Sequence, residues 1–180
     1  GRVVLDVGCG DGELLARLRR DKGVEGKGIE LEPEQVLRCL CRGLPVLQYD
    51  IERGLSSLED HSVDVVILSQ TLQTLRDPRR VLLDLLRVGK KVIVSFPNFA
   101  HWRCRLQLAV LGRAPVTKEL PFSWHNSPNI HFFSLKDFDR FCRKNGVAIE
   151  RRIPLIRNRL SPVRFAPNLL AEQAIYVTSR

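Results

Sequence analysis

A glycine-rich loop between a short apolar run and a helical pattern constrains the fold of this chain more than any other feature. Residues 3–7, Val-Val-Leu-Asp-Val, are typical of a buried parallel strand, and the leucines within residues 14–18 share one face at helical spacing. Gly8, Gly10 and Gly12 lie between them, where glycine allows a tight turn and a close approach of the backbone to a ligand. The sequence therefore predicts a strand, a turn and a helix that build a nucleotide-type site.

The acids around this loop indicate which nucleotide it binds. The spacing is G-x-G-x-G, with Cys9 inside the loop, whereas the dinucleotide fingerprint is G-x-G-x-x-G. Asp11 and Glu13 crowd the start of the helix, and two carboxylates there repel a diphosphate. S-adenosylmethionine (SAM) carries a sulfonium and an ammonium group and no phosphate, so it suits such a loop.

Two further acids follow apolar stretches at the expected distance. Glu30 ends a predicted strand at 24–31, about 20 residues beyond the loop, where a carboxylate accepts hydrogen bonds from both ribose hydroxyls. Asp50 ends a predicted strand at 45–51 and is placed to accept a hydrogen bond from the adenine amino group. The alternative interpretation treats Asp6 and Asp11 as helix-capping acids and Glu30 and Asp50 as loop acids.

Strand and helix patterns alternate through the first hundred residues, which predicts an α/β fold with a parallel sheet and helices on both faces. Ligands of such sheets bind beyond the carboxyl ends of the strands, beside the first strand. Two late strands without a substantial crossover helix between them predict an antiparallel finish to the sheet. The further elements expected are helices at 33–42, from 77, at 99–111 and from 134, and strands at 64–69, 91–96, 148–153 and 174–178.

The second half is rich in aromatic residues. Phe99, Trp102, Leu106 and Val110 recur at helical spacing, and ordinary core packing is expected for the last two. The irregular residues 112–133 then carry several aromatic side chains, which favours a lid or a binding loop over disorder.

The chain resembles a known family at several of these places. Residues 6–12 look like the first motif of class I SAM-dependent methyltransferases, and Glu30 and Asp50 match the next two motifs. Together with residues 67–73, 97–102, 112–117 and 128–131, they resemble the methionine-biosynthesis MetW family over nearly the whole chain. The resemblance implies a Rossmann-like sheet that binds SAM or S-adenosylhomocysteine. The residues expected to bind it are Asp6, Gly8, Cys9, Gly10, Gly12, Glu30, Leu31, Asp50, Ile51, Ser69 and Gln70.

The resemblance also implies roles for these side chains. Asp6 and Gly8 would hold the methionine amino group, Leu31 and Ile51 would pack on adenine, and Ser69-Gln70 would line the methionyl side. MetW-like proteins are associated with homoserine O-acyltransferase, the entry enzyme of methionine synthesis, which they are thought to bind and activate. The resemblance therefore implies a SAM-binding partner of that enzyme. Because the sequence offers a complete set of SAM-binding residues and no defined acceptor site, we hypothesise that SAM exerts feedback on acyl transfer.

An active methyltransferase on a small-molecule acceptor is the second interpretation. His101, His125 and His131 are its weak candidates for a base, although the last two would equally well tie down the loop through ring hydrogen bonds. Whether the chain transfers methyl groups is not decided by the sequence. Nucleic acid is disfavoured as an acceptor, because Ser69-Gln70-Thr71-Leu72 lacks an Asn-Pro-Pro-Tyr pattern, and no carboxylate cluster predicts a metal.

Length and charge place these functions on one domain, residues 1–180, with a cofactor-binding half at 1–97 and an acceptor or partner half at 98–180. Residues 101–180 hold 14 Lys and Arg against 5 Asp and Glu, so the net charge of +9 arises in that half, as a solvated surface or for an acidic protein partner. The five scattered cysteines are interpreted as reduced packing residues, with a reactive Cys9 as the alternative. Cytoplasm is expected, since neither a signal peptide nor a spanning run is present. The family usually has a helix before the first strand, so one flank of the sheet is expected to be less covered.

Overall fold

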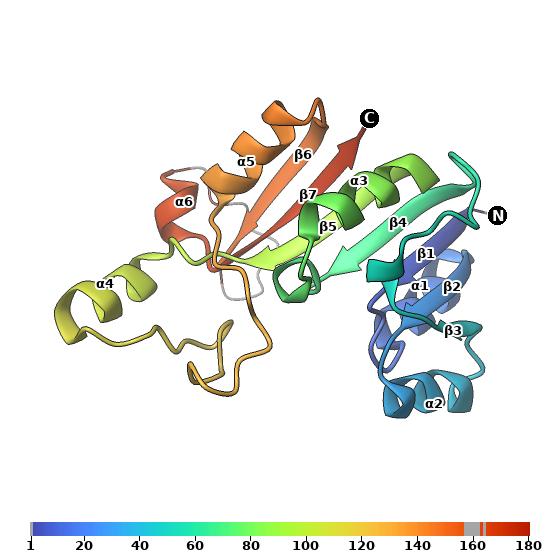
Figure 1. Cartoon of the computed structure of the whole chain (residues 1–180), viewed down its shortest axis with the longest axis horizontal. Helices are drawn as coiled ribbons and strands as arrows, with labels where there is room; N and C mark the ends of the chain where they lie inside the picture. Colours follow the sequence, from blue (N-terminus) through green and yellow to red (C-terminus); the bar gives the residue numbers. More distant parts are fainter. Residues whose placement is uncertain (1, 157–162, 164) are drawn as a thin grey trace.

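A single mixed sheet organises the computed structural model of the chain (Figure 1). The structure describes residues 2–156, 163 and 165–180, so Arg157, Arg159 and Arg164 of the basic half lie outside the described residues. The strands of the described part are β1 (Val3–Val7), β2 (Glu25–Glu30), β3 (Val46–Gln48), β4 (Val63–Ser69), β5 (Gly89–Pro97), β6 (Ala148–Leu155) and β7 (Gln173–Ser179).

The strand order is β3-β2-β1-β4-β5-β7-β6. The first five strands pair in parallel, whereas β7 is inserted between β5 and β6 and runs antiparallel to both. The predicted mostly parallel sheet with an antiparallel finish is therefore confirmed. The chain leaves β1 toward β3 and returns to β4 on the other side, so the switch point lies between β1 and β4, where sheets of this kind bind ligands.

Helices connect the parallel strands and cover the sheet on both faces (Figure 1). From β1 the chain first runs toward β3, through α1 and α2, and later runs the opposite way from β4 to β5, through α3. Because such crossovers are right-handed, α1 and α2 lie on one face of the sheet, and α3 lies on the other face beside α5. No helix within the described ranges has the length and hydrophobicity to span a bilayer. The helices are α1 (Glu13–Lys22), α2 (Pro33–Cys41), α3 (Pro78–Val88), α4 (Trp102–Leu111), α5 (Leu135–Lys144) and α6 (Pro167–Leu170), with 3-10 turns η1 (Ile51–Arg53) and η2 (Leu72–Thr74).

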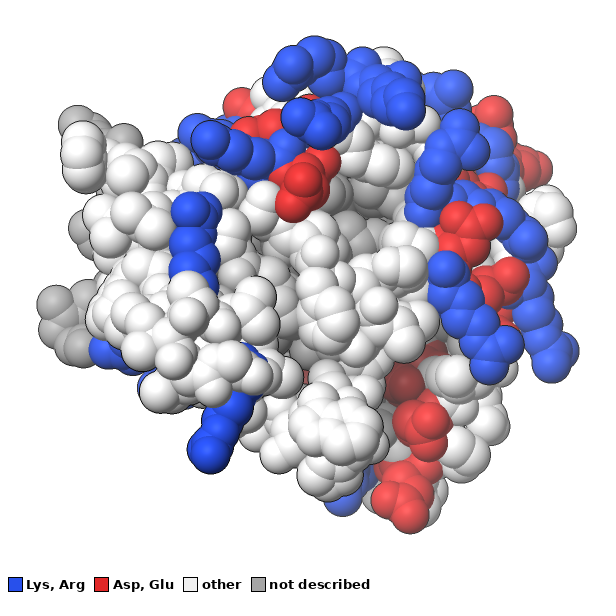
Figure 2. All heavy atoms as spheres, turned by 60° about the vertical axis from the view of Figure 1, so that its left-hand side comes forward, with Lys and Arg blue, Asp and Glu red and all other residues white. Residues whose placement is uncertain are grey.

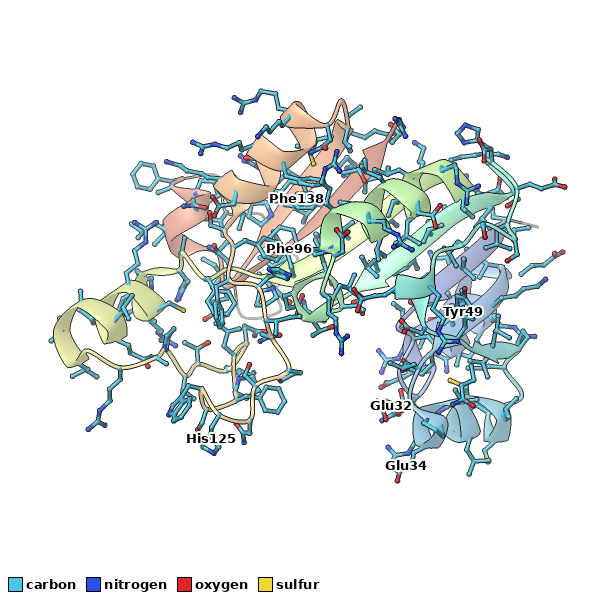
Figure 3. The ribbon with its side chains drawn as sticks, in the orientation of Figure 1. Glu32, Glu34, Tyr49, Phe96, His125 and Phe138 are labelled. Carbon is cyan, nitrogen blue, oxygen red and sulfur yellow. The ribbon has the colours of Figure 1, made fainter. Side chains whose placement is uncertain are left out.

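The core beneath α3 and α5 is built around aromatic rings. Phe96 of β5 is fully buried, and its ring centroid lies 4.6 Å from that of Phe133, 5.0 Å from that of Phe138 and 5.5 Å from that of Tyr176. Figure 3 shows Phe96 and Phe138 close together between β5 and α5. Phe133 ends the irregular 112–133 segment, so this packing fixes one end of that segment to the sheet.

The first helix buries a narrower stripe than its leucine pattern predicts. Leu15 is fully buried, Leu18 is half-buried and Leu14 is exposed, so the leucine face of this helix is only partly covered. The added Cβ of an alanine at Gly26 would lie 2.4 Å from a methyl carbon of Leu15, which shows how closely α1 approaches β2. Leu15 packs directly against Gly26, and the neighbouring Leu14 lies outside this contact.

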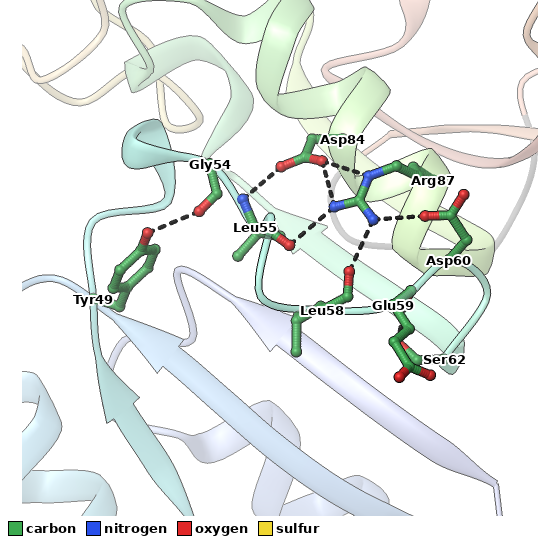
Figure 4. A network of polar contacts seen from close by, with 9 residues as sticks. All are labelled: Tyr49, Gly54, Leu55, Leu58, Glu59, Asp60, Ser62, Asp84 and Arg87. Atoms are coloured by element: carbon green, nitrogen blue, oxygen red, sulfur yellow. Dashed lines mark hydrogen bonds and ion pairs between the residues drawn. The ribbon is translucent and has the colours of Figure 1, made fainter.

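The third strand is also shorter than expected, because β3 ends at Gln48 and the chain then enters a long loop. Arg87 of α3 holds this loop by donating to the carbonyls of Leu55 at 2.9 Å and Leu58 at 2.8 Å, and it pairs with Asp60 and Asp84 (Figure 4). The connection between β3 and β4 contains no α-helix, and the Arg87 side chain provides hydrogen-bond donors for the backbone carbonyls of this loop.

The helix α4 departs most from the sequence prediction. Leu106 and Val110 are 52% and 68% exposed, so the expected core packing of both is wrong. The helix begins at Trp102 rather than at Phe99 and projects beyond the end of β5, where the sheet offers no surface to cover its apolar side chains (Figure 1). Of its residues only Cys104 is buried.

The start of α5 provides a stability prediction. The Ser134 hydroxyl accepts from the Asp137 amide at 3.3 Å, and the Asp137 carboxylate accepts from the Ser134 amide at 2.9 Å, so both halves of the capping box that the sequence suggested are present. We expect Ser134→Ala to lower the free energy of unfolding by about 1 kcal/mol, measured by urea denaturation. The exposed Ser56 gives the control, because Ser56→Ala should stay within about 0.5 kcal/mol of the wild type. An equal loss in both variants would contradict the assigned cap.

Candidate functional site

The three loop glycines follow β1 and adopt positive φ angles, of 69°, 56° and 77° for Gly8, Gly10 and Gly12. They serve different purposes. A Cβ on Gly8 would lie 2.5 Å from the Thr71 hydroxyl, and one on Gly12 would lie 2.4 Å from a methyl carbon of Leu44, so both glycines are required by packing within the protein. A Cβ on Gly10 meets nothing within 4 Å, so Gly10 is the loop glycine that borders open space.

The amide groups of the loop are engaged inside the protein. The amides of Gly8 and Cys9 both donate to the Ile29 carbonyl, at 2.8 and 3.2 Å. The Gly10 amide donates to Glu30 Oε2 at 2.8 Å. In a dinucleotide site such amides point at a pyrophosphate. Here a fixed carboxylate takes the place of that anion, so the geometry disfavours a diphosphate at this turn.

The two acids on which the sequence argument relied contribute less to this preference than expected. Asp11 forms an ion pair with Arg42, with 2.7 Å between Oδ2 and the guanidinium, and its Oδ1 accepts from the Glu13 amide. Glu13 pairs in turn with Arg17 one helical turn later. Because each carboxylate has an arginine partner, their repulsion of an anion is largely offset. Asp11 precedes the N-cap residue Gly12 and accepts from the first amide of α1, so it bonds this helix end without being its N-cap.

The uncompensated negative charge lies deeper, at Asp6 and Glu30. Asp6 is 2% exposed, and burial first and the charge of Glu30 second raise the pKa of its carboxyl from 3.8 to about 7. The side chain sits near the end of β1, directly before the glycine turn. A cationic group placed beside Asp6 would stabilise its ionised form, so the two carboxyls fit the ammonium of SAM and do not fit a phosphate.

Glu30 holds the loop as well as facing the candidate site. Its Oε1 accepts from the amides of Leu31 at 2.7 Å and Glu32 at 3.0 Å, in addition to the bond from Gly10 to Oε2. These three bonds leave one lone pair of Oε2 for a ligand hydroxyl. Leu31 is exposed next to it, and Glu32 lies at the start of α2, where Figure 3 shows it with Glu34.

At the end of β3, Asp50 caps the turn η1, because its Oδ1 accepts from the Glu52 amide at 2.9 Å. The structure therefore describes Asp50 as a loop acid, as in the alternative interpretation, and one that caps this turn. Ile51 is buried in the core cluster. The roles that the resemblance gives to Asp50 and Ile51 at an adenine ring stay predictions.

At the end of β4, Ser69 and Gln70 meet a residue that the sequence analysis did not select. Ser95 of β5 lies opposite Ser69 in the parallel register, with 3.0 Å between the hydroxyl oxygens, and its carbonyl accepts from the Gln70 amide at 2.9 Å. Gln70 has a φ of 54°, a left-handed conformation that is uncommon outside glycine. Ser95 was missed because its place beside Ser69 depends on the strand register, which the sequence does not specify.

Gln73, also missed, links this end of the sheet to the 112–133 segment. Its side-chain Nε2 donates to the backbone carbonyl of Gln70 at 2.7 Å. Its backbone carbonyl accepts from the amides of Ile130 and His131, each at 3.0 Å. The side chain is buried, and its Oε1 has no hydrogen-bond partner among the described residues. Hydrogen bonds therefore connect Gln70 to residues 130–131 through Gln73.

The three candidate histidines do not gather around the loop. His101 caps α4, and burial lowers the pKa of its ring; the His131 Nε2 lies 3.4 Å from the Arg76 carbonyl oxygen, as in the loop-tying interpretation. His125 is exposed at the tip of the 112–133 segment, edge-on to Trp124 (Figure 3). Across the described ranges, no group of three or more His, Cys, Asp and Glu residues is placed to hold a metal ion.

Four of the five cysteines are buried, and the exposed one is Cys41. Burial is the first cause that raises the pKa of Cys9, whose Sγ lies 3.9 Å from that of Cys39. A thiol with a raised pKa and no access to solvent is a poor nucleophile, so the geometry favours the packing interpretation of Cys9.

We therefore expect one thiol per chain to react quickly with 5,5′-dithiobis(2-nitrobenzoic acid) at pH 8, and five in guanidinium chloride. The Cys41→Ser variant should lose the fast phase. A fast phase that persists in Cys41→Ser and disappears in Cys9→Ser would instead identify Cys9 as reactive.

An apolar groove of about 540 Å³ lies between α4 and the 112–133 segment. Trp124 on its rim is 83% exposed, and Trp102 on α4 is 42% exposed with the Arg103 guanidinium 5.3 Å from its ring centroid. The groove lining contains none of the residues assigned to the SAM site. Its lining residues include Phe99, Arg105, Leu108, Leu120, Phe122, Trp124 and Phe132.

Comparison with known proteins agrees with the geometry. The family described as "Methionine biosynthesis protein MetW" matches residues 1–178. The chain is 36% identical over 162 residues to the "Bifunctional methionine biosynthesis protein MetXA/MetW" of Rhodopirellula baltica, covering 85% of this chain and 26% of that protein. The chain thus spans about a quarter of the length of that relative. It is 30% identical to a "Ubiquinone biosynthesis O-methyltransferase" of Cupriavidus pinatubonensis, covering 91% and 67% of the two chains.

Solved structures share the fold. An S-adenosylmethionine-dependent methyltransferase from Mesorhizobium loti superposes with a TM-score of 0.71 at 17% identity, covering all of this chain and 91% of the other. A complex of the Haloferax volcanii Trm112 methyltransferase activator and a putative methyltransferase gives a TM-score of 0.70 at 18% identity, with coverage of 99% and 82%. The fold is thus that of Rossmann-like methyltransferases, and the chain belongs to the MetW family of methionine biosynthesis proteins.

Proposed function

We propose that the sheet edge formed by the carboxyl ends of β1, β2 and β4 binds SAM or S-adenosylhomocysteine. The main support for this proposal is the buried pair of Asp6 and Glu30 beside the open space at Gly10. Asp6 would receive the ligand ammonium, and the remaining lone pair of Glu30 would accept a ribose hydroxyl. The adenine would lie toward the ends of β2 and β3, at Leu31, Asp50 and Ile51, and the methionyl side would lie along Ser69 and Gln70.

We propose further that the chain acts as a SAM-binding partner of homoserine O-acyltransferase, with residues 1–97 binding SAM and residues 98–180 contacting the enzyme. A relative whose name combines MetXA and MetW supports an association of the two activities. The exposed apolar groove supports it too, because large apolar patches on a protein surface commonly mark interaction sites. The candidate histidines are engaged in capping or loop contacts or lie exposed at a tip, an arrangement that gives less support to a methyl-transfer base.

Feedback by SAM is the expected consequence of this association. Gln70, at the methionyl side of the proposed site, bonds to Gln73, which bonds to residues 130–131 beside the groove. A ligand that binds one arrangement of this connection better than another shifts the complex toward that arrangement. SAM, a product made downstream of homoserine acylation, would thereby act on the first step.

The experiment is a titration of SAM into the reconstituted pair while acyl transfer to homoserine is followed. We expect the rate to change with SAM concentration and to saturate, and the Gln73→Leu variant to keep SAM binding while losing part of that response. A rate that stays unchanged at saturating SAM would end the feedback proposal. An acyltransferase that neither binds this chain nor changes its rate on adding it would end the partner proposal.

An active methyltransferase on a small-molecule acceptor is the second candidate, favoured by the 30% identity to an O-methyltransferase over 91% of this chain. Its test is transfer of a labelled methyl group from SAM to phenol or amine acceptors. Methyl transfer that the purified wild-type chain retains after further purification, and that Asp6→Asn loses, would establish this function. Formation of no labelled product with any acceptor favours the partner role.

A further inference from the structure

We infer that α4 and residues 112–133 together form the surface that docks on the acyltransferase. We call this surface the docking face. The inference rests on the proposed partner role and adds to it where on the chain the enzyme binds and what chemistry its contacting surface has.

The first support is the composition of α4. A helix that packs on its own domain has an apolar stripe and a polar side, whereas a helix that is apolar all round is normally buried on every side. Apart from Cys104, α4 is not buried, and its bulky apolar side chains are exposed. The helix projects from the sheet at the left of Figure 1. Its exposed bulky residues are Trp102, Leu106, Leu108, Val110 and Leu111.

The second support is the shape beside that helix. The lining of the groove of about 540 Å³ includes the rings of Phe99 and Phe132, which meet edge to face with 4.5 Å between centroids. Leu108, Phe122 and Trp124 line it and remain exposed. A recess of this size takes one or two large apolar side chains, which is how the central anchors of protein interfaces are held.

The third support is charge. Residues 98–133 contain Arg103, Arg105, Arg113 and Lys118 against one acid, Glu119. Figure 2 shows a broad uncharged surface on this side of the molecule, with basic side chains standing singly on it. Such a surface fits an apolar segment flanked by acidic side chains, because complementary charges around an apolar centre speed and orient docking. We therefore assign to the acyltransferase an apolar ridge with an acidic border.

The same charges argue against a second copy of this chain as the occupant. In a two-fold dimer the same patch faces itself, so the basic side chains of the docking face would confront one another across the interface. Like charges facing one another oppose association. A partner of different sequence, carrying the acids that residues 98–133 lack, removes this conflict.

The test measures the affinity of the full chain for purified homoserine O-acyltransferase by calorimetry. Leu108→Glu and Trp124→Glu change exposed side chains, so both variants should fold and keep the wild-type affinity for SAM. We expect each to bind the enzyme about 30-fold more weakly, as at an interface anchor, and Arg113→Glu to weaken binding by about tenfold. The matched control is Leu40→Glu, an exposed leucine of α2, which should bind as the wild type does.

The outcomes separate the two levels of the argument. If the wild-type chain does not bind the enzyme, the partner role itself fails. If the wild type binds and the docking-face variants bind equally well, or if Leu40→Glu is the variant that weakens binding, the assigned surface is wrong. Analytical ultracentrifugation of the chain alone is the last measurement. If the wild-type chain is a dimer and Leu108→Glu is a monomer, the docking face binds a second copy of this chain, and the inference is overturned.

Discussion

Gly10→Val is expected to weaken SAM binding by about 100-fold or more, which corresponds to about 2.7 kcal/mol. The glycine borders open space and its amide is fixed by Glu30, so the added methyl groups would project toward the volume that the ligand needs. The residue also has a φ of 56°, which a β-branched side chain tolerates poorly, so part of the loss would come from a displaced loop. Isothermal calorimetry with SAM measures the effect directly.

Gly23→Val separates ligand collision from backbone strain. Gly23 has a φ of 61°, and a Cβ there also meets nothing within 4 Å, but it lies at the C-terminal end of α1, away from the carboxyl ends of the strands. Both variants should therefore lose similar stability, while Gly23→Val binds SAM as the wild type does. Normal SAM affinity in Gly10→Val would refute the assigned loop. An equal loss of SAM affinity in Gly10→Val and Gly23→Val would show that the effect comes from destabilised folding and not from a collision with the ligand.

Local patterns predicted the elements and the topology of the first half well. The glycine turn, the strand ends at Glu30 and Ser69 and the antiparallel finish follow from residue periods and from the few connections that parallel sheets allow. Parallel strands end at one edge, so polar residues at those ends come together wherever the exact register falls. This is why the candidate site was found from residues far apart in the sequence.

Contacts that depend on register or on a missing surface were not predictable. Ser95 and Gln73 join the site through neighbouring strands and a turn, and neither belongs to a sequence motif. The pattern of α4 gave the helix, but helical spacing states only which side chains share a face. It does not state whether anything covers that face, so Leu106 and Val110 were wrongly assigned to the core.

The origin of the charge preference shows the same limit. Asp11 and Glu13 are next to the loop in sequence, but Arg42 and Arg17 balance them, and Arg42 comes from another helix. In the proposed site, the carboxyls that would face the ligand cation are instead the buried Asp6 and Glu30, and no count of charges reveals that burial. The sequence argument for a cationic ligand used a different pair of acids.

The pH dependence of folding provides an independent measure of the Asp6 environment. A carboxyl with a pKa of about 7 when folded and 3.8 in an unfolded chain binds more protons in the folded state between those values. Stability of the ligand-free protein should therefore fall as the pH rises from about 4 to about 7, by an amount on the order of 4 kcal/mol at most, and then level off. Asp6→Asn should flatten this part of the profile, measured by urea denaturation across the pH range.

SAM affinity should show the opposite trend, because the ligand ammonium favours the ionised carboxylate that burial disfavours. Below pH 7 binding must expel the Asp6 proton, so the dissociation constant should fall by up to about tenfold per pH unit between pH 5 and pH 7, about 50-fold in total. Calorimetry in buffers of different ionisation enthalpy should record the release of about one proton at pH 5.5. The ligand 5′-methylthioadenosine lacks the ammonium group, so its affinity should not change over this range. A slope that survives in Asp6→Asn would assign the titration to another group, whereas its loss together with a flat methylthioadenosine profile would connect the buried charge to the amino-acid end of the ligand.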